Sequence, residues 1–189
     1  SVKFFRKDMQ GAADSLIYAS EDSLIYMFTD PILWADSLQI TGDTILIRTY
    51  DGMVDKLFVF DHAFMANKVD STKFNQIKGK RLTGFFEEND LRRILIKGNG
   101  QSLYYATEEE KTDSISSEPP KQNFVGVNKA ICSNIEIFMI DRQIDEILFL
   151  VKPEGTFFPI EQLPKEEEKF DGFIWDDARR PHSRNEIFD

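Results

Sequence analysis

The stretch DSLIYASEDSLIYMFTD (Asp14–Asp30) contains the same five residues twice. DSLIY occupies Asp14–Tyr18 and returns unchanged at Asp22–Tyr26, and a looser copy, DSLQI, follows at Asp36–Ile40. Within each copy apolar residues lie two positions apart, the spacing that places side chains on one face of a β-strand. The residues between the first two copies suffice for a turn. The repeat therefore predicts successive short strands.

A longer repeat of strand, polar turn and strand lies over the short one. It is found at Ile45–Phe60, Leu82–Ile96 and Ile135–Leu150, and each copy predicts a β-hairpin. The polar residues 108–123 are expected to form an exposed loop between the last two copies. No helical crossovers of the kind that parallel sheets need are visible. Stacked hairpins therefore predict an all-β fold: a β-solenoid, an elongated jelly roll or a barrel.

Length, composition and charge limit the kind of protein that this chain can be. The 189 residues, 41% of them hydrophobic, are enough for one domain with a sizeable core. The net charge of −10 and the scattered basic pairs argue against a nucleic-acid partner, which requires clustered Lys and Arg. Cys132 is the single cysteine, so no intrachain disulfide forms. Because the chain opens at Ser1 without a signal-peptide pattern, we expect a processed or trimmed piece of a secreted precursor.

The end of the chain differs in character from the rest. After Pro164 the sequence is charged and lacks strand alternation. We therefore expect a β-domain over residues 1–164 and a charged C-terminal tail over 165–189, pinned to the domain by Phe173 and Trp175.

Signals for catalysis are thin. His62 and His182 lie far apart without a nucleophile motif, and such histidines are most often surface or structural residues. Cys132 is expected to be a small half-buried hydrophobe. The carboxylate runs Glu108–Glu110 and Glu166–Glu168 lack the spacing of a calcium loop and are expected to be solvated. The sequence therefore predicts no catalytic residues, no metal site and no cofactor.

Three longer segments resemble a known family. Asp22–Ile47, with its Asp-Pro turn and Gly-Asp before an apolar strand, resembles the repeat of the OstA/LptA family of periplasmic lipopolysaccharide-transport proteins. Phe74–Tyr105 and Gly126–Gly155 are similar to the OstA-like branch of Bacteroidetes, as are Gly172–Trp175 and Arg180-Pro181.

The resemblance implies an open, twisted β-jelly roll that is periplasmic and not an enzyme. Its interior would shield the acyl chains of lipopolysaccharide or lipid A on the way to the outer membrane. Its partners would be other lipopolysaccharide-transport components, or further copies of itself joined through β-edge pairing.

The phase of the strands predicts which residues line the interior. If the Asp of each DSL unit marks the phase, alternate apolar residues face inward and form an apolar groove able to take acyl chains. These residues are Leu16, Tyr18, Leu24, Tyr26, Phe28, Leu38, Ile40, Ile45, Ile47, Leu57, Val59, Ile94, Ile96, Ile147 and Phe149.

Two other functions stay open. The chain is alternatively a β-repeat scaffold or surface-interaction module with a dry core and no ligand. The second alternative is a jelly-roll enzyme or carbohydrate binder. That hypothesis requires carboxylates or exposed aromatic residues that converge in one cleft.

Overall fold

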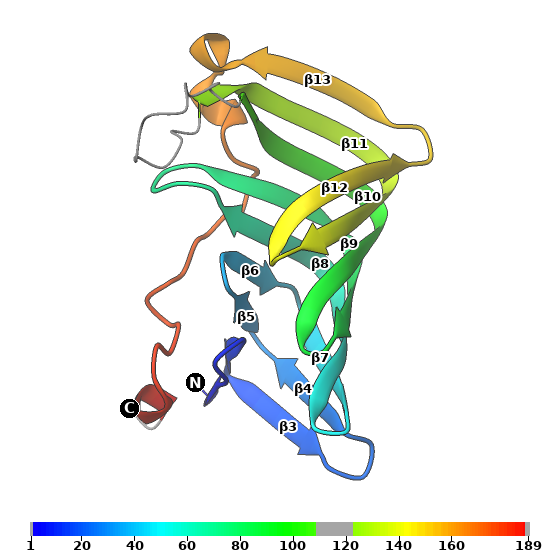
Figure 1. Cartoon of the computed structure of the whole chain (residues 1–189), viewed down its shortest axis with the longest axis vertical. Helices are drawn as coiled ribbons and strands as arrows, with labels where there is room; N and C mark the ends of the chain where they lie inside the picture. The colour runs from blue at the N-terminus through cyan, green and yellow to red at the C-terminus, as the bar shows by residue number, and fades with distance from the viewer. Residues whose placement is uncertain (1, 109–122, 188–189) are drawn as a thin grey trace, which may run out of the picture.

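The computed structural model describes residues 2–108 and 123–187 (Figure 1). This part of the chain forms strands and three short 3-10 helices but no α-helix, which confirms the all-β class. The strands are β1 (Val2–Phe5), β2 (Gln10–Ala13), β3 (Ser15–Ala19), β4 (Leu24–Phe28), β5 (Ile32–Ala35), β6 (Leu38–Thr41), β7 (Thr44–Tyr50), β8 (Met53–Lys68), β9 (Phe74–Glu87), β10 (Asp90–Glu108), β11 (Asn123–Ile140), β12 (Gln143–Leu150) and β13 (Glu154–Pro159). The 3-10 helices are η1 (Ile160–Gln162), η2 (Lys165–Glu167) and η3 (Arg184–Ile187).

The predicted hairpins are present. The two DSLIY copies form the antiparallel β3–β4 hairpin, and the three longer copies form the β7–β8, β9–β10 and β11–β12 hairpins. The turns at Asp51-Gly52, Glu88-Asn89 and Asp141-Arg142 have positive φ at both central residues. This is the conformation of type I′ turns, whose twist matches that of the flanking strands. The repeat in the sequence is thus a repeat of hairpins. Of the polar loop expected at 108–123, residues 109–122 lie outside the described residues.

Four long strands, β8 to β11, pass through a bend and so take part in two sheets. In β8 the bend falls at Asp61-His62 and in β10 at Gly98-Asn99, where φ is positive. The pairing register shifts at the same places, between Phe60 and Ala63 and between Lys97 and Gln101. Irregular residues of this kind let a strand turn a corner while its neighbours stay paired.

On one side of the bend lies sheet 1, made of β3, β4, β7, β12 and the adjoining halves of β8 to β11. On the other lies sheet 2, made of β1, β2, β5, β6, β13 and the remaining halves. The inner faces pack on one another around a single large apolar core, which joins Leu57 and Val59 of sheet 1 to Met65 and Ile77 of sheet 2. At the ends, β1, β3, β12 and β13 each pair with one neighbour, so the jelly roll is open (Figure 1).

The last described segment, residues 165–187, is here called the strap. It leaves the β13 end of sheet 2, crosses the outer face of that sheet and ends where η3 contacts β1 (Figure 1). The rings of Phe173 and Trp175 each lie 5.1 Å, centre to centre, from that of Phe74 in β9. The charged end of the chain is thus packed along the sheet.

Gly126 tests the close packing of β11 against β13. A Cβ at this position would lie 2.4 Å from the carbonyl oxygen of Phe158 and 2.3 Å from Cζ of Phe157. We expect Gly126→Ala to lower the free energy of unfolding by about 1–3 kcal/mol, because the backbone of β13 has to move. Thermal unfolding should show a drop of about 2–4 °C per kcal/mol.

Gly155 supplies the matched control in the same strand pair. Its added Cβ would meet the carbonyl oxygen of Lys129 at an ordinary 3.5 Å. Gly155→Ala should therefore leave the melting temperature almost unchanged. Equal shifts in the two variants would contradict the packing described for Gly126.

Candidate functional site

The interior between the two sheets holds most of the residues predicted to line it. Eight of them belong to the apolar core with exposed fractions of 2% or less. They are Leu38, Ile40, Ile45, Ile47, Leu57, Val59, Ile94 and Ile96. Leu16, Ile147 and Phe149 are half-buried and pack against the same core. Tyr18, near the end of the edge strand β3, is 61% exposed.

In β4 the prediction of which side chains face the interior is wrong. Ile25 and Met27 face the core, and Leu24, Tyr26 and Phe28 alternate with them on the outer face. The rings of Tyr26 and Phe28 stack there, 6.0 Å apart and nearly parallel. These three residues therefore do not line the interior of the described structure.

The register of the β3–β4 hairpin explains the error. Leu16 of the first DSLIY copy pairs with Met27, so an even-numbered residue stands opposite an odd-numbered one. The copies are eight positions apart, and an even offset keeps the parity of each residue. Identical sequences in adjacent strands thus present opposite sides to the core, because a shift of one residue exchanges the two faces of a strand.

The interior is filled by its own side chains. A cavity of about 20 Å³ lies between the sheets, with Leu38 and Ala35 on one side and Phe86 and Leu91 on the other. That volume holds about one water molecule. An acyl chain would therefore need the two sheets to separate.

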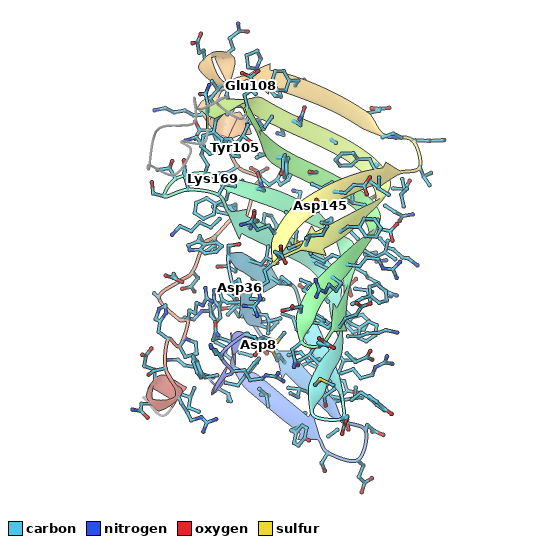
Figure 2. The ribbon with its side chains drawn as sticks, viewed as in Figure 1. Asp8, Asp36, Tyr105, Glu108, Asp145 and Lys169 are labelled. Carbon is cyan, nitrogen blue, oxygen red and sulfur yellow. The ribbon has the colours of Figure 1, made fainter. Side chains whose placement is uncertain are left out.

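We call the place where this cavity reaches the surface the mouth. Asp8 and Asp36, labelled in Figure 2, both line the cavity. The tip of the β11–β12 hairpin reaches across, and its Arg142 guanidinium lies 3.3 Å from Oδ1 of Asp36 and 3.2 Å from Oδ1 of Asp90. Arg142 thus ties the β5–β6 turn of sheet 2 to the β9–β10 turn of sheet 1.

The electrostatics of this contact are those of a surface ion pair. The charge of Asp36, followed by the hydrogen bond from Arg142 to Asp90, raises the pKa of Arg142 above its ordinary value. The Arg142 side chain is more than half exposed, and solvent and salt screen such contacts strongly. Side-chain contacts of modest strength, rather than backbone ladders, hold the mouth closed.

At the β12–β13 end the interior is less covered. Phe149 of sheet 1 is half-buried there, and Phe157 of sheet 2 is 49% exposed although its ring lies over Gly126 on the inner face. Ser102, on the inner face beside Ile77, is 1% exposed, and its hydroxyl has no hydrogen-bond partner in the described part of the chain. Sequence reasoning missed Phe157 and Ser102, because the period-two pattern marks apolar columns and gives no weight to single residues near a strand end.

The other residues considered for chemistry lie apart from one another in the structure. Cys132 is buried, its thiol donates to the carbonyl of Asn134 at 3.0 Å, and burial raises the pKa of the thiol. The exposed His62 ring lies 3.0 Å from the carboxylate of Asp43, and His182 is on the strap. In residues 2–108 and 123–187 no three potential ligands gather around a point where a metal could bind. The same part of the chain has no helix long and apolar enough to cross a membrane.

A second hollow, here called the cleft, lies between the strap and the outer face of sheet 2 and has a volume of about 890 Å³. Several carboxylates line the cleft, which is the feature that the hypothesis of an enzyme or carbohydrate binder requires. However, Asp30 and Asp176 both pair with Arg179 at 2.7 Å, and Asp43 pairs with His62. Arg179 of the strap lies between Asp176 of the strap and Asp30, which precedes β5, so these ion pairs help to attach the strap to sheet 2.

Neighbouring residues of β4 test the placement of the core. Met27→Asp puts an unpaired charge in the core and should lower the free energy of unfolding by more than about 3 kcal/mol. Phe28→Asp, one residue along, loses a half-buried ring stack and should cost about 1 kcal/mol. Urea unfolding of the two variants measures the difference, and a larger loss at Phe28 would restore the phase predicted from the sequence.

Comparisons with known proteins address the fold. No protein-family model matches the chain, and no curated protein matches its sequence. A solved structure that it resembles is the crystal structure of LptH, the LptA homologous periplasmic component of the conserved lipopolysaccharide transport device from Pseudomonas aeruginosa. The match has a TM-score of 0.51 and 11% identity and covers 77% of this chain and 95% of the LptH chain. At this identity the likeness is one of fold, and the chain has an LptA-like open β-jelly roll.

Proposed function

We propose that the protein is a non-enzymatic periplasmic carrier or bridge component of lipopolysaccharide transport, of the OstA-like type found in Bacteroidetes. It shields the acyl chains of lipopolysaccharide or lipid A between its two sheets. The observation that carries the proposal is the continuous apolar interior between two open sheets, in a fold shared with a periplasmic transport component. No catalytic residue takes part.

Loading requires the sheets to part. Apolar side chains of the two inner faces would exchange their mutual contacts for contacts with the acyl chain, which preserves most of the favourable burial of apolar surface. The half-buried Phe149 and the exposed Phe157 mark the β12–β13 end as the place where an acyl chain first meets the interior. The mouth at Arg142 is the side along which the sheets separate.

The filled interior favours a second candidate function. A chain whose core residues already exclude water is also suited to be a scaffold or surface-interaction module that binds no lipid. Under that function the sheets never separate, and an apolar probe finds no entry. A single binding experiment distinguishes the two functions.

Photo-crosslinking at adjacent positions of β12 provides that experiment. Phe149 packs against the core, while Leu148 is 36% exposed on the opposite face of the strand. With p-benzoylphenylalanine at Phe149, irradiation in the presence of lipid A should give a protein–lipid adduct visible by mass spectrometry. The same photoreactive residue at Leu148 is the control and should give little adduct. Equal or absent adducts at both positions would favour the scaffold.

The bridge proposal adds a prediction about assembly. The edge strands β1 and β3 lie at one end of the sheets and β12 and β13 at the other, and unpaired edges pair readily with another chain. Pairing of unlike edges continues head to tail. We therefore expect sedimentation velocity to show growing species over roughly a hundredfold increase in concentration.

A charge on an edge strand should suppress this association. Ile17 of β3 is 53% exposed, and Ile17→Lys should shift the distribution towards the monomer, because edge lysines oppose strand pairing. The matched control is Ile131→Lys on β11, a strand with a neighbour on both sides, where the side chain is 58% exposed. A monomer at every concentration would remove the bridge and leave the carrier.

A further inference from the structure

The outer face of sheet 2 carries a row of three buried glutamines. Gln10 of β2, Gln39 of β6 and Gln76 of β9 are 5%, 3% and 0% exposed. The strand register aligns them, since Gln10 pairs with Trp34, Trp34 with Gln39, Gln39 with Ala66 and Ala66 with Gln76. The glutamines thus occupy every second position of a line that crosses the strands. Buried amides are costly unless they form hydrogen bonds.

The strap forms hydrogen bonds with all three glutamines, through its backbone at Gln76 and Gln39 and through a side chain at Gln10. The Gln76 amide donates from Nε2 to the carbonyl of Glu168 at 3.1 Å and accepts at Oε1 from the backbone N–H of Phe170 at 2.9 Å. The bonded carbonyl and N–H belong to residues two apart, which is the pattern by which a residue bonds to a parallel neighbouring strand. At the far end of the row, Oε1 of Gln10 accepts from Nε of Arg180 at 2.9 Å.

Gln39 repeats this arrangement further along the strap. Its Nε2 donates to the carbonyl of Ile174 at 2.7 Å, and its Oε1 accepts from the N–H of Asp176 at 2.8 Å. These bonds use backbone atoms and therefore recognise an extended segment without regard to its side chains. Specificity for the segment has to come from the rings and charges beside them.

Aromatic rings provide the first part of that specificity. Phe173 and Trp175 pack on Phe74, and Phe170 meets Phe64 edge to face, with 6.5 Å between ring centres. Lysines of the sheet lie over the strap rings, including Lys78 Nζ at 4.6 Å from the centre of Phe170. Such contacts between cations and aromatic faces add to the apolar contact.

Charge provides the second part. Between positions 166 and 177 the strap has six acidic residues and one basic residue, Lys169, which is labelled in Figure 2. The sheet beneath presents Lys68, Lys78 and Lys129, and Lys129 forms a salt bridge with Glu167. The surface therefore fits an extended, acidic segment that carries aromatic residues.

The strap is attached less completely than a core strand would be. The cleft of about 890 Å³ remains between it and the sheet. The indole N–H of Trp34 is fully buried on this face and has no hydrogen-bond partner in the described part of the chain. A buried donor without a partner destabilises the closed arrangement, and solvation of that donor favours lifting of the strap. Both features indicate that the strap is exchangeable.

We infer that the outer face of sheet 2 is a peptide-recognition surface that the chain's own strap fills, and that the same segment of a second copy is the partner it fits. Every contact that the strap makes within one chain is available between two chains. The tether gives the chain's own strap an effective concentration in the millimolar range, so a strap from a second copy competes poorly until the tether is opened or cut.

Cutting the tether tests the inference with every residue still present. A protease site inserted between Pro164 and Lys165 allows cleavage of the folded chain. A dye-labelled peptide with the sequence of residues 165–189 should then exchange with the cut strap, as fluorescence polarisation would show. The uncut chain should bind the same peptide about 100-fold more weakly, because its own strap competes.

Glutamine variants identify the surface. Gln39→Met with Gln76→Met keeps the side-chain volume but removes the four hydrogen bonds to the strap, and should weaken peptide binding by about 100-fold. Gln101→Met is the matched control, because Gln101 lines the cleft but forms no hydrogen bond to the strap among the described residues. Equal binding by the double variant and the control would overturn the inference, as would a cut strap that leaves a still-folded chain without exchange.

Hydrogen exchange in the uncut chain covers the case in which cutting unfolds the protein. The amides of Phe170 and Asp176 should lose protection in the double glutamine variant, while those of β8 and β9 keep theirs. Unchanged protection at both amides would show that the glutamines do not hold the strap. None of these measurements depends on whether the interior binds lipid.

Discussion

Apolar contact between the inner faces of the two sheets is the interaction on which the rest of the structure depends. A single antiparallel sheet with one apolar face has to cover that face, and this chain does so by bending the sheet onto itself. Strands β8 to β11 stay paired through the bend, so the hydrogen-bond ladder continues from one sheet to the other. The positive φ of Asp61, His62 and Asn99 is the local strain that the core burial offsets, whereas Gly98 adopts its positive φ without such strain.

Much of the fold could be predicted from the sequence, because hairpin repeats and period-two spacing are local signals. The phase of β4 could not, since the side of a strand that faces the core depends on its pairing with the next strand. The pair formed by Leu16 and Met27 shows this. The glutamine row was missed for a related reason: Gln10, Gln39 and Gln76 are far apart in the chain and meet only through four strand registers.

The two faces of sheet 2 use opposite kinds of contact. Its inner face is held by apolar side chains that carry little directional information, whereas its outer face is held by amide groups that require an extended backbone at fixed positions. Buried polar contacts of this kind stabilise a structure only when every buried donor and acceptor has a hydrogen-bond partner. Gln39 and Gln76 meet that condition and Trp34 does not, which places the less stable attachment at the strap rather than at the core.

Opening the interior would spare the backbone ladder. At the bend the strands are continuous, so parting the sheets there would break many hydrogen bonds that water would have to replace. At the mouth the sheets meet through side chains, with Arg142 as the ionic link between the turns at Asp36 and Asp90. The two sheets are joined by continuous strands at the bend and only by side chains at the mouth. They would therefore separate at the mouth and stay together at the bend. An acyl chain would enter on the side where apolar side-chain contacts are the main interactions that have to be broken. Burial of the acyl chain then contributes hydrophobic free energy that offsets the loss of those apolar contacts.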